Sequence, residues 1–239
     1  MFDIDGTLTE SSDLDAATYL DALRDVFGFR DVSDDWASYP HATDGGILAE
    51  LFRTRLARPP TPEEIGRMQR RYVSLLRERV DDAGGLHPVP GAAEILVRLA
   101  NDPCYAVSLA TGAWRSSAAL KLSATGLPVD RFPAAFADDA PSREGICQTS
   151  RQRAEASAGE EFRRVVYVGD GVWDVRTSRG LGYGFIGIGR DPGAEKLRAE
   201  GASLILPDFQ DAEAFFSALG KTEHCHDNPC EPSEQSSAG

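Results

Sequence analysis

The sequence predicts an α/β fold, with a doubly wound parallel sheet as its core and an all-helical domain inserted near the start of the chain. From residue 92 to residue 219, strand-like and helix-like segments alternate with short connections, as in parallel sheets covered by helices. Residues 13–83 instead show helical spacing and little strand pattern. We therefore expect a core domain of residues 1–12 and 86–220, a helical insert of residues 13–85, and a disordered tail of residues 221–239, rich in Ser, Pro and Glu.

The insert is predicted to form helices in three places. Apolar residues recur at helical spacing over 14–27, and Gly28 is a typical helix end. A second helix fits residues 47–57. Thr61 is a suitable N-cap for a third helix over 62–80, because a proline and two glutamates follow it in the first turn.

The core is predicted from the change between helical and strand periodicity along the rest of the chain. Turn-forming Gly, Pro and Asp residues lie between the segments. We expect strands at 105–110, 132–137, 165–168, 183–188 and 203–206, and helices at 92–100, 114–124, 145–158, 172–180, 193–200 and 211–219.

The first residues of the chain carry the clearest chemical signal. An apolar lead-in is followed by Asp3 and Asp5, and residues two apart on a strand point to the same side. Neighbouring carboxylates repel each other unless a cation or a shared proton lies between them. This favours a magnesium site in which one aspartate is a nucleophile, whereas the alternative is an acidic turn after a buried strand.

Two further strand ends and a lysine complete a pattern. After the run DIDGT at residues 3–7, one strand ends at Thr111 and Gly112, and another ends in the run GDGVWD at residues 169–174, with Lys121 between them. In these motifs the chain resembles the haloacid dehalogenase superfamily, phosphatase type, over residues 1 to about 219. The insert resembles its helical C1-type cap, as in phosphoglycolate phosphatase-like members, and the core would be Rossmann-like.

The resemblance implies a role for each motif residue. Asp3 would attack phosphorus to give an aspartyl-phosphate, and Asp5 would protonate the leaving group and later activate water. Thr111 and Gly112 would bind a phosphate oxygen at a helix N-terminus. Mg²⁺ would be held by Asp3, Asp5 through its backbone carbonyl, Asp170 and Asp174. Helix capping is the alternative for Asp170 and Asp174.

Lys121 has an unusual position for the family's lysine, which many members carry just before the last motif. It is the sole lysine between residues 111 and 169, and the resemblance implies that it neutralises Asp3 and the phosphoryl group. A solvated helix lysine is the alternative. An arginine could take the place of the lysine, and the candidates are Arg143, Arg151 and Arg153, although a flat guanidinium fits such a site differently from an ammonium group.

The cap is expected to select the substrate. The loop at residues 39–46 is polar and ends in glycine, so His41 and Asp44 are candidate substrate-binding residues, with plain surface exposure as the alternative. Trp114 and Trp173 each follow a catalytic strand and are expected to pack in the core or at its rim. The acidic pair at residues 138–139 either frames the pocket or forms a turn.

The predicted function is magnesium-dependent hydrolysis of a small phosphomonoester. A phosphomutase of the same family and a non-catalytic phosphometabolite-binding protein are the alternatives. Dehalogenation is disfavoured because the dehalogenases of the family that the chain resembles lack the second aspartate, here Asp5, since a halide leaves without a proton. Phosphonate hydrolysis is disfavoured because that family reaction uses a cap lysine and residues 9–90 contain none.

Composition narrows the partners and the compartment. The net charge of −13 disfavours nucleic acid and anionic membranes as partners. No apolar run approaches the roughly 20 residues that span a bilayer. The 4 cysteines are too scattered for a disulfide framework. We expect a cytoplasmic protein, a monomer or homodimer, that binds a small phosphorylated metabolite.

Both ends of the chain raise questions. Only Met1 and Phe2 precede the predicted nucleophile, although a central strand normally has about five or six residues. We therefore expect the true start to lie upstream, or the chain to be truncated, with an α-amino group near the core and poor stability. The His and Cys residues at 224–230 match no zinc-binding spacing and are interpreted as part of the tail.

Overall fold

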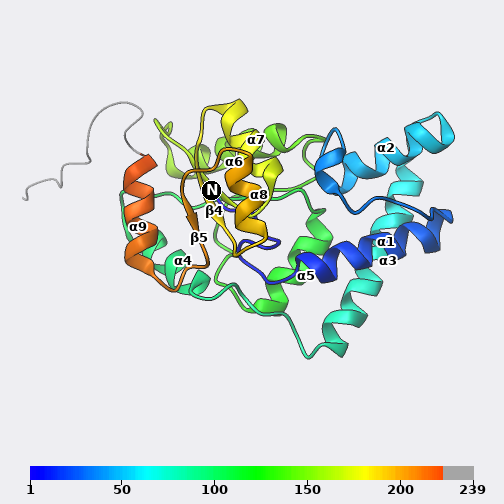
Figure 1. Ribbon diagram of the computed structural model, residues 1–239, viewed down its shortest axis with the longest axis horizontal. Coiled ribbons are helices and arrows are strands. Elements are labelled where there is room, and N and C mark those ends of the chain that lie inside the picture. Colours follow the sequence, from blue (N-terminus) through cyan, green and yellow to red (C-terminus); the bar gives the residue numbers. More distant parts are fainter. Residues whose placement is uncertain (223–239) are drawn as a thin grey trace, which may run out of the picture.

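A computed structural model describes residues 1–222 and shows an α/β core beside a helical cap (Figure 1). The predicted tail, with its His and Cys residues, begins at residue 221 and therefore lies almost entirely outside the described residues. The cap region contains the helices α1 (Ser12–Phe27), α2 (Asp44–Leu56) and α3 (Pro62–Asp82), and a short 3₁₀ helix, η1 (Trp36–Ser38). The domain limits themselves stay a prediction.

The sheet is parallel, and residues at the very start of the chain hold its two halves together. Phe2 bridges β1 on one side, at Leu109, and β3 on the other, at Val168. The resulting order is β2, β1, Phe2, β3, β4, β5. The strands are β1 (Leu109–Ala110), β2 (Ala134–Ala135), β3 (Val166–Gly169), β4 (Gly184–Ile188) and β5 (Ile205–Leu206).

Helices cover both faces of this sheet, as in a doubly wound fold. Leu109 and Val168 face one apolar cluster, with Phe215 of α9, whereas Ala110 and Tyr167 face another, with α6. This alternation follows from the two-residue period of strands. The core helices are α4 (Ala92–Asn101), α5 (Arg115–Thr125), α6 (Arg143–Ala158), α7 (Val172–Leu181), α8 (Gly193–Ala199) and α9 (Ala212–Lys221).

Several strands are shorter than the sequence predicts. The strands predicted at 105–110, 132–137 and 203–206 each keep two residues of ladder. Between β1 and β3 the chain offers only residues 1–3 as partners, with Phe2 N–H donating to Ser108 O at 2.9 Å and Val168 N–H to Met1 O at 2.9 Å. Few backbone groups are therefore available for a longer ladder at this central position.

The α-amino group of Met1 lies close to the core, as expected from the sequence. It donates a hydrogen bond to Val166 O at 2.9 Å. Desolvation lowers the pKa of this amino group to about 5.

Among the helices that begin earlier than predicted, two matter for the site. The helix predicted from residue 47 begins at Asp44, because the Thr43 hydroxyl accepts a hydrogen bond from Gly46 N–H at 3.0 Å. The helix predicted from residue 145 begins at Arg143, with Ser142 as its N-cap. The glycines in both first turns weaken the sequence signal for a helix.

The cap has its own apolar core, which includes one residue of the core domain. Helix α3 buries Met68, Tyr72 and two later residues at a spacing of four. Trp114, the residue before α5, is 2% exposed and packs in this cluster against Tyr19, with ring centroids 6.0 Å apart. Ala137 of the core domain packs against the same cluster, so apolar packing joins the cap to the core domain.

The start of α3 agrees with its predicted cap. Thr61 Oγ1 accepts from Glu64 N–H at 3.2 Å, and Glu64 Oε2 accepts from Thr61 N–H at 2.8 Å. Together these two bonds form a capping box.

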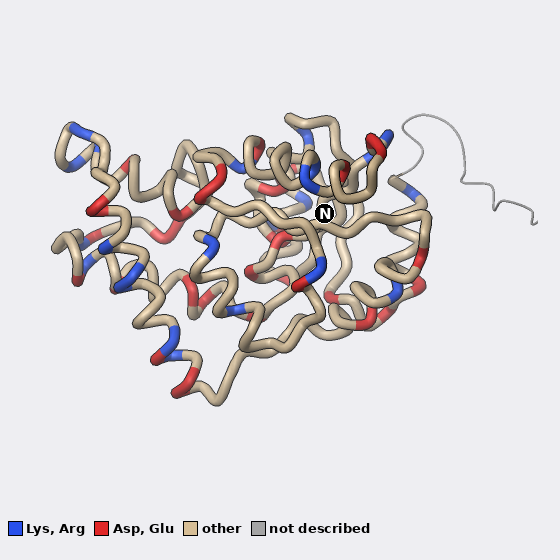
Figure 2. The backbone as a smooth tube through the Cα atoms, turned by 180° about the vertical axis from the view of Figure 1, so that it is seen from behind, with Lys and Arg blue, Asp and Glu red and all other residues tan. Residues whose placement is uncertain are grey.

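Charged residues of both signs are interspersed over the cap helices, as Figure 2 shows. Ion pairs such as Arg71 with Asp25, at 2.6 Å, join α3 to α1. Within residues 1–222, none of the helices combines the length and the apolar character needed to cross a bilayer.

Candidate active site

A partly open cavity of about 130 Å³ lies where the cap meets the ends of the strands. It brings together most of the residues that the sequence singled out, from segments far apart in the chain. The core side is lined by Asp3, Asp5, Thr111, Gly112, Arg143, Asp170 and Trp173, and the cap side includes Asp15, Tyr19, Trp36 and Asp44.

The turn that follows Phe2, the residue between β1 and β3, brings Asp3 and Asp5 to the cavity. Gly6 adopts a φ of 71°, a conformation that favours glycine. A Cβ at this position would also collide with the Asp170 carboxylate. The glycine therefore allows the first motif and the last motif to approach each other.

Asp3 is buried, and only one of its two carboxylate oxygens has a hydrogen-bond partner among the described residues. Its side chain is 2% exposed, and its Oδ2 accepts a hydrogen bond from Arg143 Nη1 at 3.0 Å. Its other oxygen, Oδ1, has no hydrogen-bond partner in the described part of the chain. Because a buried carboxylate oxygen without a partner is costly, this oxygen is suited to meet a ligand.

Arg143 organises the anionic side of the cavity. Its Nη1 also donates to Asp174 Oδ1 at 2.7 Å, and its Nε donates to Ala42 O in the cap at 2.9 Å. The guanidinium lies 5.5 Å from the centre of the Trp173 ring. Arg143 is therefore the cation that pairs with Asp3, a partner that the sequence analysis assigned to Lys121.

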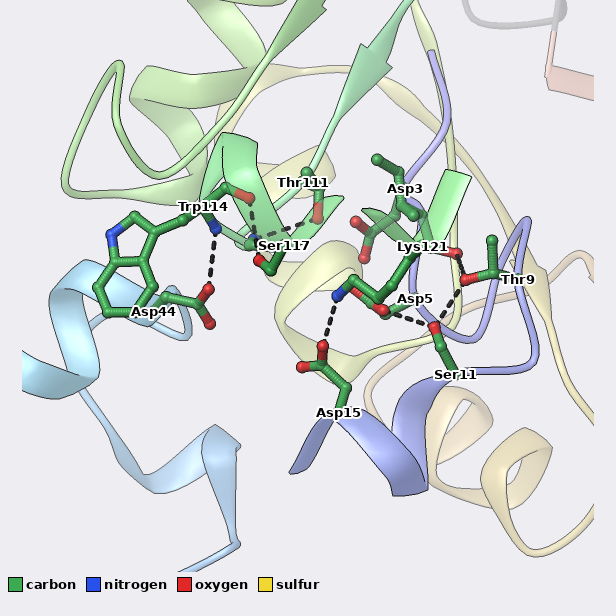
Figure 3. Close-up of polar contacts among 12 residues, drawn as sticks. Asp3, Asp5, Thr9, Ser11, Asp15, Asp44, Thr111, Trp114, Ser117 and Lys121 are labelled. Carbon is green, nitrogen blue, oxygen red and sulfur yellow. Dashed lines mark hydrogen bonds and ion pairs between the residues drawn. The ribbon is translucent and has the colours of Figure 1, made fainter. Parts of the chain in front are cut away.

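Lys121 is fully buried, so the alternative of a solvated lysine is wrong. Its Nζ donates to Asp5 Oδ2 at 2.6 Å and to Asp15 Oδ1 at 2.5 Å (Figure 3). The Ser11 hydroxyl donates to the other oxygen of Asp5 at 2.5 Å. Lys121 thus orients Asp5 and ties it to helix α1 of the cap.

The remaining arginines considered as substitutes lie elsewhere. Arg151 pairs with Glu155 at 2.7 Å, and Arg153 pairs with Asp139 at 2.7 Å. Neither they nor Asp138 and Asp139 line the cavity. The acidic pair is therefore a turn, stabilised by ion pairing, and does not frame the pocket.

Thr111 and Gly112 present donors to the cavity. The Thr111 hydroxyl accepts from Ala113 N–H at 3.2 Å, which leaves its own proton free to donate. Gly112 N–H has no hydrogen-bond partner among residues 1–222. A Cβ on Gly112 would lie 2.7 Å from Ala42 O, so a glycine permits the cap loop to approach this strand end.

The two cap candidates lie in different environments. Asp44 is 8% exposed and lines the cavity, and its Oδ2 accepts from Trp114 N–H at 2.8 Å. His41 is exposed and is not among the lining residues, although the adjacent Ala42 is. The substrate-binding role of both stays a prediction, and the geometry supports Asp44 only.

Three aspartates are arranged as a cation site. Oxygens of Asp3, Asp170 and Asp174 lie within 4.8 Å of one another. Desolvation, together with the charges of the other two, raises the pKa of Asp170 well above its usual value. Burial raises the pKa of Asp174 to about 7. A divalent cation would relieve this repulsion, so the oxygen-only donor set fits a hard metal ion.

The capping role considered for Asp174 is present as well. Its Oδ2 accepts from Gly171 N–H at 2.9 Å, while its Oδ1 pairs with Arg143. One carboxylate therefore caps α7 and still lies in the acidic cluster.

Two residues of the site were missed or underrated from the sequence. Asp15 lies in the first turn of α1, where an acidic residue is ordinary because it favours the helix dipole. Arg143 was considered only as a replacement for a lysine. No local signal marks either residue, because their partners lie between 24 and 140 residues away along the chain.

Asp3 and Asp5 thus lie beside a buried acidic cluster, at the carboxyl edge of a parallel sheet and under a helical cap. The family model for haloacid dehalogenase-like hydrolases matches residues 1–182, and the chain belongs to this family of hydrolytic enzymes. No curated protein matches the chain.

Solved structures share the fold over nearly the whole chain. A hydrolase from Pseudomonas syringae is 21% identical, with a TM-score of 0.70 and coverage of 91% of this chain and 97% of that one. A protein from Bacteroides vulgatus, provisionally assigned as a beta-phosphoglucomutase, is 19% identical, with a TM-score of 0.67 and coverage of 92% and 88%. A predicted phosphoglycolate phosphatase from Haemophilus somnus is 18% identical, with a TM-score of 0.58 and coverage of 90% and 96%.

Proposed function

We propose that the protein is a Mg²⁺-dependent phosphatase that hydrolyses a small phosphomonoester through an aspartyl-phosphate on Asp3. The observation that carries this proposal is the Asp3 carboxylate, with Oδ2 held by Arg143 and Oδ1 unpartnered in the cavity wall. A nucleophile oriented by one oxygen and free at the other is ready for attack.

In the first step, Asp3 Oδ1 forms a bond to phosphorus while the bond from phosphorus to the ester oxygen breaks. Asp5 gives a proton to the departing alkoxide, and in the second step it takes a proton from the water that hydrolyses the acyl phosphate. Asp5 lines the cavity, and its orientation is set by Ser11 and Lys121. Lys121 supplies a fixed positive charge close to the developing negative charge.

The phosphoryl group would lie against the end of β1. The Thr111 hydroxyl and Gly112 N–H are its proposed donors, because both remain available to a ligand. Asp3, Asp170 and Asp174, with the Asp5 carbonyl, would hold Mg²⁺, which neutralises phosphoryl charge when bound.

Replacement of the nucleophile tests the proposal. Asp3→Asn keeps the shape of the side chain but removes its nucleophilicity, so Mg²⁺-dependent release of phosphate from p-nitrophenyl phosphate should fall at least ~10³-fold. Asp13→Asn is the matched control, because this exposed aspartate of α1 lies outside the cavity. Substantial activity in Asp3→Asn would reject the mechanism. Trapping of a phosphorylated Asp3 by mass spectrometry after acid quench would support it.

A phosphomutase is the second candidate, supported by the structural likeness to the Bacteroides vulgatus protein. A mutase needs a bisphosphate activator and returns the phosphoryl group to a sugar, whereas a phosphatase releases inorganic phosphate without one. A non-catalytic phosphometabolite-binding protein would show no turnover at all. The cytoplasmic location, the oligomeric state and the absence of a nucleic-acid partner stay predictions.

A further inference from the structure

The cavity has an unusual charge balance. Its lining contains five aspartates, of residues 3, 5, 15, 44 and 170, and a single basic residue, Arg143. Arg143 is already paired with Asp3 and Asp174, and the nearby Lys121 is paired with Asp5 and Asp15. The described part of the cavity therefore offers no free cation to a second anionic group on a substrate.

Asp44 is a buried carboxyl without a cationic partner, and desolvation, together with the charge of Asp15, raises its pKa well above the usual value. Its side chain is more than nine-tenths buried, yet it forms no ion pair with any residue of 1–222. Its only side-chain hydrogen bond there is the one that Oδ2 accepts from Trp114 N–H. The second oxygen, Oδ1, is unpartnered on a residue that lines the cavity, and a buried charge of this kind is strongly unfavourable without a partner.

Asp15 adds a second carboxylate on the cap side. Its Oδ1 accepts from Lys121 and from the Tyr72 hydroxyl, while its Oδ2 accepts no hydrogen bond from the described residues. Figure 3 shows Asp44 beside Trp114 and Asp15 beside Lys121, each reaching from the cap toward the core. Two carboxylates in one cavity wall favour a cation between them.

Aromatic rings complete this wall. Tyr19 and Trp36 line the cavity on the cap side, and Trp173 faces it from the core side. Tyr19 is anchored by its hydroxyl, which donates to the backbone oxygen of Asp44 at 2.6 Å, and it packs edge-on against Trp36. Aromatic rings next to carboxylates are the surroundings that ammonium groups prefer, because the ring faces attract cations.

We propose that the cap side of the cavity, formed by Asp15, Asp44, Tyr19 and Trp36, is a subsite for the ammonium group of a small aminoalkyl phosphomonoester. This inference rests on the proposed function for the phosphate end of the substrate. The small cavity favours a short substrate, because pockets for drug-sized ligands are typically about 300 Å³ or larger. The same charges reject a phosphorylated carboxylic acid.

Three esters of equal length test the subsite: 2-aminoethyl phosphate, 2-hydroxyethyl phosphate and phosphoglycolate. We expect kcat/KM with Mg²⁺ to be at least ~10-fold higher for the amine than for the alcohol, and lower still for the acid. In Asp44→Asn the amine-to-alcohol ratio should fall at least ~5-fold, because the amide still accepts from Trp114 N–H but carries no charge. Asp13→Asn, which removes a charge from exposed α1 surface, should leave the ratio unchanged.

The ratio is measured within each variant, so a loss of folded protein cancels. Equal or better use of the alcohol would overturn the ammonium subsite and indicate a protonated Asp44 that hydrogen-bonds a hydroxyl. Preference for phosphoglycolate would overturn it as well. If no ester is hydrolysed, including p-nitrophenyl phosphate, the proposed function fails by itself. The ratio of Kd values for the amine and the alcohol from titration calorimetry then decides the subsite independently, with equal affinities overturning it.

Discussion

Replacement of Lys121 by methionine should destabilise the protein strongly. The Lys121 side chain has no exposed surface, and its ammonium pairs with two carboxylates, Asp5 at 2.6 Å and Asp15 at 2.5 Å. Breaking a buried ion pair costs about 3–5 kcal/mol, since the partner charges stay buried. The two carboxylates retain 19% and 18% of their side-chain exposure, so cavity water will hydrate them in part. We therefore expect the low end, about 3 kcal/mol.

Urea unfolding followed by circular dichroism at neutral pH measures this loss. For a chain of this size, about 3 kcal/mol corresponds to a fall in Tm on the order of 10 °C. Lys196→Met is the matched control, because Lys196 is exposed on α8, and its change should stay within about 0.5 kcal/mol.

A second substitution separates the charge effect from lost packing. Adding Asp15→Asn to Lys121→Met removes one of the two stranded carboxylates, so the double variant should lose less stability than the sum of the single changes. A loss below about 1 kcal/mol for Lys121→Met, or strict additivity with Asp15→Asn, would refute the view that Lys121 holds these carboxylates together.

Three further outcomes follow from the geometry. Because burial raises the pKa of Asp174 to about 7, this carboxyl keeps its proton below neutral pH and must release it to bind a metal. Mg²⁺ affinity from calorimetry should therefore rise by up to about tenfold per pH unit between pH 5 and pH 7, and a flat profile over that range would contradict this. Gly112→Ala places a methyl group 2.7 Å from the backbone oxygen of Ala42, which must shift. KM for p-nitrophenyl phosphate should therefore rise severalfold, with a loss of about 1–3 kcal/mol in urea unfolding, and an unaltered KM would count against a tight cap contact here. Thr61→Ala removes the acceptor for Glu64 N–H and should lower the free energy of unfolding in urea by about 1 kcal/mol. No loss would mean that the first turn of α3 frays in solution.

Much of the fold was predictable because its signals are local. The alternation of helix-like and strand-like segments predicted the helices of the core, and the predicted capping of α3 by Thr61 is present. The strands were predicted at the correct places but with too many residues. Alternating apolar residues indicate where a strand can form, but they do not show how many of its residues pair with a neighbouring strand. The predicted starts of the helices that begin at Asp44 and Arg143 lie two or three residues too late in the chain, because the glycines after their N-caps weaken the helix signal.

The catalytic side of the site was also largely readable from the sequence. Asp3, Thr111 and Asp170 each follow a strand, and the carboxyl ends of parallel strands meet at one edge of the sheet. These three residues therefore converge without any knowledge of the packing. The sequence alone thus determined the family, the core and the residues that meet on the core side of the cavity.

The tertiary structure decided which charges meet. Arg143 rather than Lys121 pairs with Asp3, Lys121 joins Asp5 to Asp15 of the cap, and Asp44 stays without a cation. Arg143 meets Asp3 within the core domain, whereas the contact of Lys121 with Asp15 depends on how the cap lies against the core, where Trp114 packs against Tyr19. Spacing along the chain carries no information about such contacts, because electrostatic partners are selected by distance in space and by burial.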